Sequence, residues 1–177
     1  MSRFPFAGIA LIVACFALPA RTPADLTAAS SRRAAPDFTL NNAEGNPVKL
    51  SAYKGKVVLL DFWGTFCEVC KVEVPWYVEF QSKYKESGLS VVGVSLDEDG
   101  WKSVKSFIEE QKVNYTIVIG TWDLAKLFGF RNELPLTLLI DREGEVADMH
   151  AGVVDKAKFE SEIQILLKES SSKKSDK

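Results

Sequence analysis

The 177-residue sequence has few of the side chains that bind transition metals, with three cysteines and a single histidine. A structural zinc site takes four Cys or His ligands, so this small supply nearly excludes one. The sequence also lacks an excess of basic residues, since 22 Lys and Arg stand against 24 Asp and Glu. Nucleic-acid binding leaves a strongly basic footprint, and the net charge of −2 therefore gives no reason to expect a nucleic-acid partner.

A hydrophobic run long enough to span a bilayer comfortably is also missing. The apolar run Phe4–Leu18 follows Arg3 and falls short of the roughly 20 residues that a transmembrane helix needs. A positive start, an apolar middle and small residues after it are typical of a secretory signal, which we place at residues 1–20. A buried helix of the folded domain is the weaker alternative, because Pro5 and Gly8 oppose it.

The end of this signal allows three interpretations. Ile12–Cys15 (IVAC) resembles the bacterial lipoprotein box, which makes Cys15 a candidate for lipidation. A soluble product cut near Ala20 or Ala24 and an uncleaved anchor are the alternatives. In each case we expect the protein in the periplasm or on the outer face of the membrane, where cysteines form structural disulfides or serve redox chemistry.

The remaining chain divides into three parts. Residues 21–34 hold Ala, Ser, Thr, Arg and Pro without periodicity and predict a flexible linker. Residues 35–168 form the predicted domain, and the polar residues 169–177 predict a disordered tail. Within the domain, patterns of period 2 and period 3.6 alternate. They predict a hairpin at 38–40 and 48–50, strands at 57–62, 90–95, 115–119, 137–140 and 145–151, and helices at 67–86, 101–112, 122–128 and 156–168. This order indicates an α/β fold with a mixed central sheet flanked by helices and an N-terminal β-hairpin.

The pair Cys67 and Cys70 has the spacing of a redox-active dithiol at a helix start. Residues three apart on a first helical turn lie within disulfide range. Gly64 and Thr65 allow a turn out of the preceding strand, so Cys67 falls at the helix N-terminus, where the dipole and free N–H groups favour a thiolate. Cys70, one turn inside, would be the resolving thiol. Half a zinc site and an inert staple are the alternatives, but no second C-x-x-C is present and so short a loop stabilises little.

The sequence around the dithiol resembles a known family. Residues 61–71 (DFWGTFCEVCK) resemble the thioredoxin superfamily, and the stretch through Pro75 looks like the extracytoplasmic TlpA/ResA group of thiol-disulfide oxidoreductases. Further segments similar to that group follow one another across about 35–168: APDFTL at 35–40, LSAYKGKVV at 50–58, VGVSLDE at 92–98 and LPLTLLID at 134–141. The resemblance implies a thioredoxin-like fold and thiol–disulfide exchange without a cofactor or metal.

Two positions depart from that group. The family usually has Trp where Phe66 stands and Pro where Val69 stands. The dipeptide Glu68-Val69 occupies the position that tunes the redox poise, so a reduction potential does not carry over from the resemblance. Replacing Pro frees a backbone N–H near the sulfurs.

The resemblance also implies roles for residues outside the dithiol. Pro135 would be a cis-proline against the disulfide and would present the backbone of Leu134 to a substrate chain, whereas on its own it would be an ordinary strand-start proline. Trp63 could shield the dithiol and contribute to a docking surface. Asp61 would accept a proton below Cys70, with a strand-end carboxylate near solvent as the alternative.

Glu73 and His150 are the other acidic and titratable residues of interest in the sequence. Glu73 matches the acidic residue that adjusts thiol acidity in the TlpA/ResA group, with a solvated helix face as the alternative. Two carboxylates near one dithiol would raise each other's pKa values and those of the thiols. His150 is most simply a strand residue with no catalytic partner.

We therefore predict an enzyme that reduces disulfides in exported proteins, with apocytochrome c as a family-level candidate substrate. Its other partner would be an upstream thiol reductant, membrane-bound by resemblance, and the enzyme itself would touch the membrane only through an N-terminal anchor. Peroxiredoxin-like peroxide reduction is the runner-up, although Thr65 stands one residue too close to Cys67 for the Thr-x-x-Cys pattern. A copper-delivery module is a third hypothesis, for which Cys-x-x-x-Cys with a His would be required.

Overall fold

The computed structural model describes residues 26–169, which form one central sheet with helices on both sides. The sheet has the strand order β1-β8-β7-β4-β5-β6. β4, β5 and β6 run parallel, whereas β7 and β8 are antiparallel to their neighbours, so the sheet is mixed as predicted. Its strands are β1 (Arg33–Ala34), β4 (Val57–Trp63), β5 (Leu89–Ser95), β6 (Thr116–Ile119), β7 (Leu136–Ile140) and β8 (Glu145–Ala151).

The predicted N-terminal hairpin is present as a small separate sheet of β2 (Thr39–Asn41) and β3 (Pro47–Lys49). The helices also lie close to the predicted ranges. They are α1 (Glu68–Tyr84), α2 (Trp101–Glu110), α3 (Trp122–Leu127) and α4 (Lys156–Lys168), with short 3-10 helices at Ala29–Ser31, Leu50–Tyr53 and Lys85–Ser87. None of the helices in residues 26–169 combines the length and the apolar character that crossing a membrane requires.

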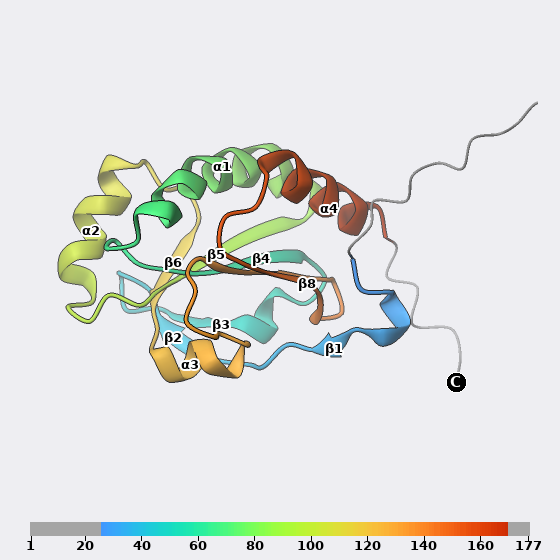
Figure 1. Ribbon diagram of the computed structural model, residues 1–177, viewed down its shortest axis with the longest axis horizontal. Helices are drawn as coiled ribbons and strands as arrows, with labels where there is room; N and C mark the ends of the chain where they lie inside the picture. Colours follow the sequence, from blue (N-terminus) through green and yellow to red (C-terminus); the bar gives the residue numbers. More distant parts are fainter. Residues whose placement is uncertain (1–25, 170–177) are drawn as a thin grey trace, which may run out of the picture.

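β4 separates two apolar cores because successive side chains of a strand point to opposite faces. Val58, Leu60 and Phe62 face α3 and the hairpin, while Val57 and Leu59 face α1 and α4. Figure 1 shows α1 and α4 on one side of the sheet and α3 with β2 and β3 on the other. Burial on both faces explains why this strand is an almost continuous apolar run, and it makes the single carboxylate of Asp61 conspicuous.

The folded domain begins earlier than predicted. The linker expected at 21–34 is wrong from Leu26 onward: the N–H of Thr27 donates to the carbonyl oxygen of Ala147 at 2.8 Å, and β1 pairs with β8. Arg32 is buried, and its guanidinium donates to Asp141 at 3.1 Å and to Glu169 at 2.6 Å. Charged groups 109 and 137 residues away thus fix a segment whose own composition is that of a linker.

Several predictions about the chain ends fall outside the described residues. They are the signal at 1–20, the lipidation candidate Cys15, the linker residues 21–25 and the tail from residue 170 onward. The first residue of the predicted tail, Glu169, is described and accepts the ion pair from Arg32.

Candidate active site

The dithiol lies where β4 leaves the sheet and α1 begins. Cys67 and Cys70 form a disulfide with their Cα atoms 5.3 Å apart. Cys67 is the N-cap residue of α1, and its Sγ accepts a hydrogen bond from the N–H of Cys70 at 3.2 Å. Cys67 is half-buried, whereas Cys70 is 1% exposed. The helix dipole and the free N–H groups of the first turn stabilise a thiolate at Cys67, so the outer sulfur is the one suited to attack.

A buried carboxylate holds the turn ahead of the dithiol. Asp97, just after β5, accepts hydrogen bonds from the N–H of Thr65 at 3.0 Å and from the Thr65 hydroxyl. It also accepts from the hydroxyl of Ser95 at 2.7 Å. Ser95 lies opposite Trp63 in the parallel ladder, so the end of β5 positions the turn at the end of β4. Asp97 belongs to a segment that matched the family, but no local pattern indicated this contact.

Three large hydrophobic side chains near the start of α1 are exposed, beside the exposed ion pair of Glu68 and Lys71. Phe66, Val69 and Val72 are 56%, 47% and 52% exposed. We call these three residues the apolar rim. Beside the rim, a groove of about 520 Å³ is lined by Thr65, Phe66, Leu96, Asp97, Glu98, Asp99, Ser103 and Trp122.

Trp63 does not contribute to this surface, and its predicted docking role is wrong. Its side chain is 1% exposed and packs on Phe107, with ring centroids 5.0 Å apart. It lies in the same buried cluster as Cys70, because it shares the α1 face of β4 with Val57 and Leu59. Its shielding of the dithiol stays a prediction, and Phe66 is the exposed aromatic residue beside Cys67.

The peptide bond between Leu134 and Pro135 is cis, as the resemblance implied. Leu134 is half-buried and packs in the cluster that holds both cysteines. Pro135 is buried, and its carbonyl oxygen accepts a hydrogen bond from the N–H of Gly152 at 2.9 Å. The segment before β7 is thereby fixed against the dithiol.

Asp61 and Glu73 are both buried, so the solvent-exposed alternatives for them are wrong: their exposed fractions are 2% and 0%. The hydroxyl of Tyr77 donates to Glu73 at 2.7 Å, and the hydroxyl of Thr137 donates to Asp61 at 3.1 Å. The two hydroxyl oxygens are themselves 3.1 Å apart. The N–H of Val154 also donates to Glu73, at 3.3 Å. A line of polar groups thus joins the two carboxyls across the α1 face of the sheet.

Burial dominates the acid–base behaviour of this line. It raises the pKa of Asp61 well above the usual value, and the charge of nearby Glu73 raises it further, while the hydrogen bond from Thr137 lowers it. Burial also raises the pKa of Glu73, against lowering contributions from Tyr77, the Val154 N–H and His150. Both carboxyls therefore retain protons to higher pH than ordinary side chains, and Asp61 does so more strongly.

Comparison of the sequence with known proteins shows the family to which this chain belongs. The model of the AhpC/TSA family matches residues 32–149. A thiol-disulfide oxidoreductase ResA from Geobacillus kaustophilus is 36% identical over 138 residues, covering 78% of this chain and 79% of the relative. A ResA from Bacillus cereus is 30% identical over 174 residues, covering 92% and 96% of the two chains. The chain belongs to the AhpC/TSA family and is a ResA-like thiol-disulfide oxidoreductase.

A solved structure agrees with this assignment. A thiol:disulfide interchange protein of the thioredoxin family from Chlorobium tepidum is 27% identical and superposes with a TM-score of 0.70, covering 77% of this chain and 97% of that one. The thioredoxin-like fold predicted from the sequence is confirmed. Phe66 and Val69, the two positions at which the sequence departs from the expected family pattern, both belong to the apolar rim.

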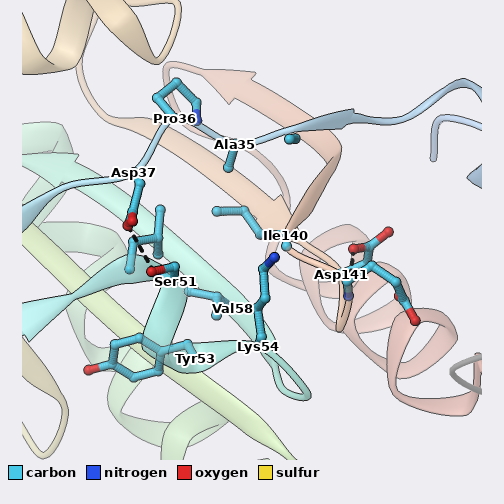
Figure 2. A pocket seen from close by; sticks show the side chains of 13 residues that line it. Ala35, Pro36, Asp37, Ser51, Tyr53, Lys54, Val58, Ile140 and Asp141 are labelled. Atoms are coloured by element: carbon cyan, nitrogen blue, oxygen red, sulfur yellow. Dashed lines mark hydrogen bonds between the residues drawn. The ribbon is translucent and has the colours of Figure 1, made fainter.

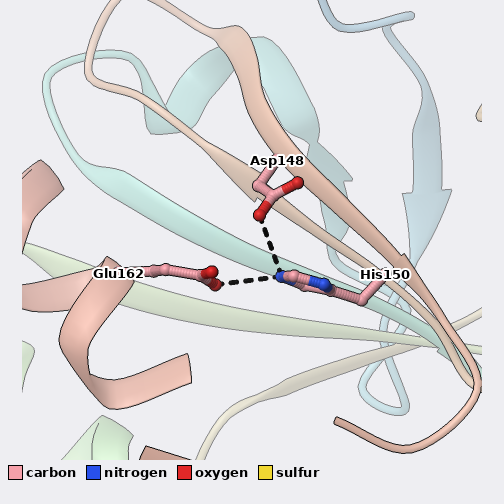
Figure 3. A group of neighbouring side chains, drawn as sticks. All are labelled: Asp148, His150 and Glu162. Atoms are coloured by element: carbon pink, nitrogen blue, oxygen red, sulfur yellow. Dashed lines mark hydrogen bonds and ion pairs between the residues drawn. The ribbon is translucent and has the colours of Figure 1, made fainter. Parts of the chain in front are cut away.

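This ResA-like chain carries a second buried polar cluster that the sequence analysis missed. His150 on β8 points toward α4, where its Nε2 lies 2.9 Å from Glu162 and 3.2 Å from Asp148 (Figure 3). Burial alone would lower the pKa of His150, but the hydrogen bonds with Asp148 and Glu162 raise it to about 9. Asp148 and His150 are two residues apart on β8 and share one face of that strand, while Glu162 lies beside the apolar stripe of α4. Sequence patterns can indicate these positions within each element, but they cannot predict that the two elements bring the three side chains together.

The same cluster is the one group within residues 26–169 whose donor atoms could hold a metal ion, since they lie within 4.8 Å of one another. A protonated imidazole also suits this place, because its Nε2–H can donate to Glu162 and its positive charge offsets the nearby carboxylate of Asp148. His150 was predicted to be a strand residue with no catalytic partner: it does lie on β8, and its partners Asp148 and Glu162 form a buried ion-paired cluster. The absence of a metal and of a catalytic partner for His150 both stay predictions.

A hollow of about 230 Å³ lies at the opposite end of β4 from the dithiol. Figure 2 shows Val58 and Ile140 lining it together with Asp37, Ser51 and Lys54. The N–H of Ser51 donates to Asp37 at 2.9 Å, which ties the 3-10 helix after β3 to the segment before β2. Because Val58 starts the strand that ends at Trp63, this hollow is remote from the sulfurs and takes no part in thiol exchange.

Proposed function

We propose that this oxidoreductase works outside the cytosol and reduces disulfides in exported proteins, with apocytochrome c as the candidate substrate. The observation that carries the proposal is the asymmetry of the dithiol. The half-buried Cys67 stands at a helix N-terminus beside an exposed apolar rim, while Cys70 is enclosed behind it. An unfolded substrate exposes apolar segments next to its cysteines, and such segments fit a surface of this kind.

The reaction follows from the same asymmetry. The Cys67 thiolate attacks one sulfur of the substrate disulfide, forming a mixed disulfide and releasing the other substrate sulfur as a thiolate. Cys70 then loses its proton and attacks Cys67, so that the Cys67–Cys70 bond forms and the second substrate sulfur leaves. Two electrons pass from the protein to the substrate, and an upstream thiol reductant must return them. We propose that this reductant is membrane-bound.

The proposed location rests on the N-terminal sequence and on family resemblance. Residues 1–20 have the pattern of a secretory signal, and Cys15 ends a segment similar to the lipoprotein box. A lipid at Cys15 would hold the domain at the outer face of the membrane through the residues that precede Leu26. Mass spectrometry of the exported protein decides this point: a mature N-terminus beyond Cys15 excludes lipidation and leaves export intact.

Trapping of mixed disulfides tests the proposed reaction. In Cys70→Ser the second attack is impossible, so exported substrates should remain attached to Cys67 and be recovered by non-reducing electrophoresis. Cys67→Ser is the matched control, because it keeps one thiol in the same helical turn and should trap few substrates. Equal trapping by the two variants would contradict the assigned roles, and an absence of exported proteins among the trapped species would contradict the substrate class.

The peroxide-reducing alternative finds no support in the site. A peroxidatic cysteine needs nearby donors for the peroxide, but the hydroxyl and the N–H of Thr65 are both directed at Asp97 and not at Cys67. Peroxide consumption by the reduced protein should therefore be no faster than that of a simple dithiol.

A further inference from the structure

Four buried side chains are joined by three contacts between oxygen atoms, and one of them, Glu73, lies one helical turn from Cys70. Glu73 and Tyr77 are 2.7 Å apart, Tyr77 and Thr137 3.1 Å, and Thr137 and Asp61 3.1 Å. All four side chains are at most 2% exposed, so bulk solvent does not reach these contacts. We call Glu73, Tyr77, Thr137 and Asp61 the oxygen chain.

The three contacts of the oxygen chain need one hydrogen atom each, so counting the available hydrogens shows how many protons the two carboxyls must carry. Each hydroxyl carries one hydrogen, and an ionised carboxylate carries none. With both carboxyls ionised, Tyr77 donates to Glu73 and Thr137 donates to Asp61. The two hydroxyl oxygens then face each other at 3.1 Å with no hydrogen between them, which leaves lone pairs opposed in a buried site. One additional proton on either carboxyl satisfies all three contacts.

We propose that Asp61 and Glu73 share a single proton at neutral pH, and that Tyr77 and Thr137 are positioning residues through whose hydroxyls the two carboxyls share it. In one arrangement Asp61 donates to Thr137, Thr137 to Tyr77 and Tyr77 to Glu73. In the other arrangement all three hydrogen bonds point the opposite way. Moving each hydrogen along its own contact converts one arrangement into the other, and no electron is transferred.

The surroundings favour the arrangement with the proton on Asp61. The N–H of Val154 donates to Glu73, and positively charged His150 also lowers the pKa of Glu73, so that carboxyl is the one held ionised. Asp61 has only Thr137 to oppose the effect of burial, which raises its pKa well above the usual value. Two further ionisable groups interact with the oxygen chain: His150 lowers the pKa of Glu73, and the charge of Asp61 raises the pKa of buried Tyr115. His150 is in turn paired with Asp148 and Glu162, Glu162 also lies 3.8 Å from Lys158, and Cys70 precedes Glu73 by one turn of α1.

The shared proton reduces the charge beside the dithiol from two negative charges to one. Each negative charge disfavours a thiolate, so the pair makes the dithiol easier to ionise than two separate carboxylates would. When Cys70 attacks the mixed disulfide, its S–H bond breaks, and the ionised member of the pair can accept that proton and return it to the departing substrate thiolate. This consequence rests on the proposed function, whereas the proton count is a property of the oxidised protein alone.

The proton count can be measured without a substrate. In the oxidised full-length protein, NMR of isotope-labelled carboxyl carbons follows both side chains through a pH titration, with Asp61→Asn and Glu73→Gln assigning the signals. One of the two carboxyls should be protonated at neutral pH, and both signals should follow the same two macroscopic steps, as coupled groups do. Two ionised carboxyls at neutral pH, or independent titrations at ordinary values, would overturn the proposal even if the protein proves to be an active reductase.

Variants of the two hydroxyls test the positioning role. Thr137→Val removes the hydroxyl while keeping the volume, and Thr137→Ser keeps a hydroxyl; the first should uncouple the two carboxyl titrations and the second should preserve their coupling. Tyr77→Phe should also uncouple them, because it keeps the ring that packs on Phe159 and removes the link. Tyr84→Phe is the matched control, since its hydroxyl lies on the same helix but contacts Glu160 and Gln164.

The pH profile of thiol alkylation gives a readout that a merely structural role would not change. Without the Tyr77 hydroxyl, Glu73 loses a donor that holds it ionised, so the proton shifts toward Glu73, which follows Cys70 by one turn of α1. The midpoint of the Cys67 alkylation profile should then move to lower pH by about one unit, in the same direction as in Glu73→Gln. A Tyr77→Phe profile identical to that of the parent, with coupled titrations intact, would contradict the assigned role.

Discussion

Loss of stability at alkaline pH tests the ion-paired cluster of Asp148, His150 and Glu162. The pKa of His150 is raised from its ordinary value of 6.5 to about 9, so the folded state binds a proton more tightly than the unfolded chain does. A group with a raised pKa stabilises the fold fully below pH 6.5, and this contribution is lost as the pH rises through 9. The difference of about 2.5 units corresponds to about 3 kcal/mol of unfolding free energy.

This magnitude applies because the cluster is nearly closed to water. His150 and Glu162 are 7% and 3% exposed, so bulk solvent screens their attraction little. Other groups also titrate in the same range, and the contribution of His150 must therefore be isolated by a variant. His150→Gln keeps a polar side chain of similar reach but carries no charge, so it removes the imidazolium from Asp148 and Glu162 and leaves Glu162 with its 3.8 Å ion pair to Lys158.

Urea denaturation of the oxidised protein at several pH values supplies the measurement. Below pH 6.5 the parent should exceed His150→Gln by about 3 kcal/mol, and the two free energies of unfolding should converge as the pH rises past 9. A difference that stays constant across this window would refute the reasoning, because it would mean that His150 stabilises the fold by packing on Phe159 and not by its charge.

Three further predictions concern the rim, the turn and the N-terminal segment. Phe66→Ala removes a ring that is 56% exposed, so it should change the unfolding free energy by less than about 0.5 kcal/mol yet raise the KM for protein disulfides several-fold in steady-state assays; an unchanged KM would remove Phe66 from the docking surface. Asp97→Asn weakens the acceptor that holds the turn before the dithiol, and single-turnover exchange should slow while the fold persists; an unchanged rate would assign Asp97 a purely structural role. Arg32→Ala strips the buried cation from Asp141 and Glu169 and should lower the unfolding free energy by about 3 kcal/mol; a loss below about 0.5 kcal/mol would show that this segment is dispensable.

Sequence patterns predicted the elements of the fold because each element carries its own periodicity. The strand that becomes β4 is an apolar run, and the final amphipathic helix ends at Lys168 as expected. The dithiol could be predicted for the same reason, since its spacing within one helical turn is a local property.

Contacts between elements could not be predicted in this way. Tyr77 and Thr137 are 60 residues apart, and Arg32 and Asp141 are 109 residues apart, so no period relates them. His150 lacked an apparent partner for the same reason, because Glu162 meets it only after α4 packs on the sheet. Buried polar pairs of this kind depend on which faces meet, and the composition of each segment alone suggests a solvated residue or a linker.

The central claim is that Cys67 is the attacking thiol of a redox-active dithiol and that Cys70 is its enclosed partner. The most direct test is the rate of iodoacetamide labelling of each cysteine in the reduced protein, resolved by mass spectrometry of the labelled peptides. Cys67 is half-buried at a helix N-terminus and Cys70 is 1% exposed, so Cys67 should be labelled much faster at neutral pH. Faster labelling of Cys70, or labelling of Cys67 no faster than that of an ordinary thiol, would contradict the account.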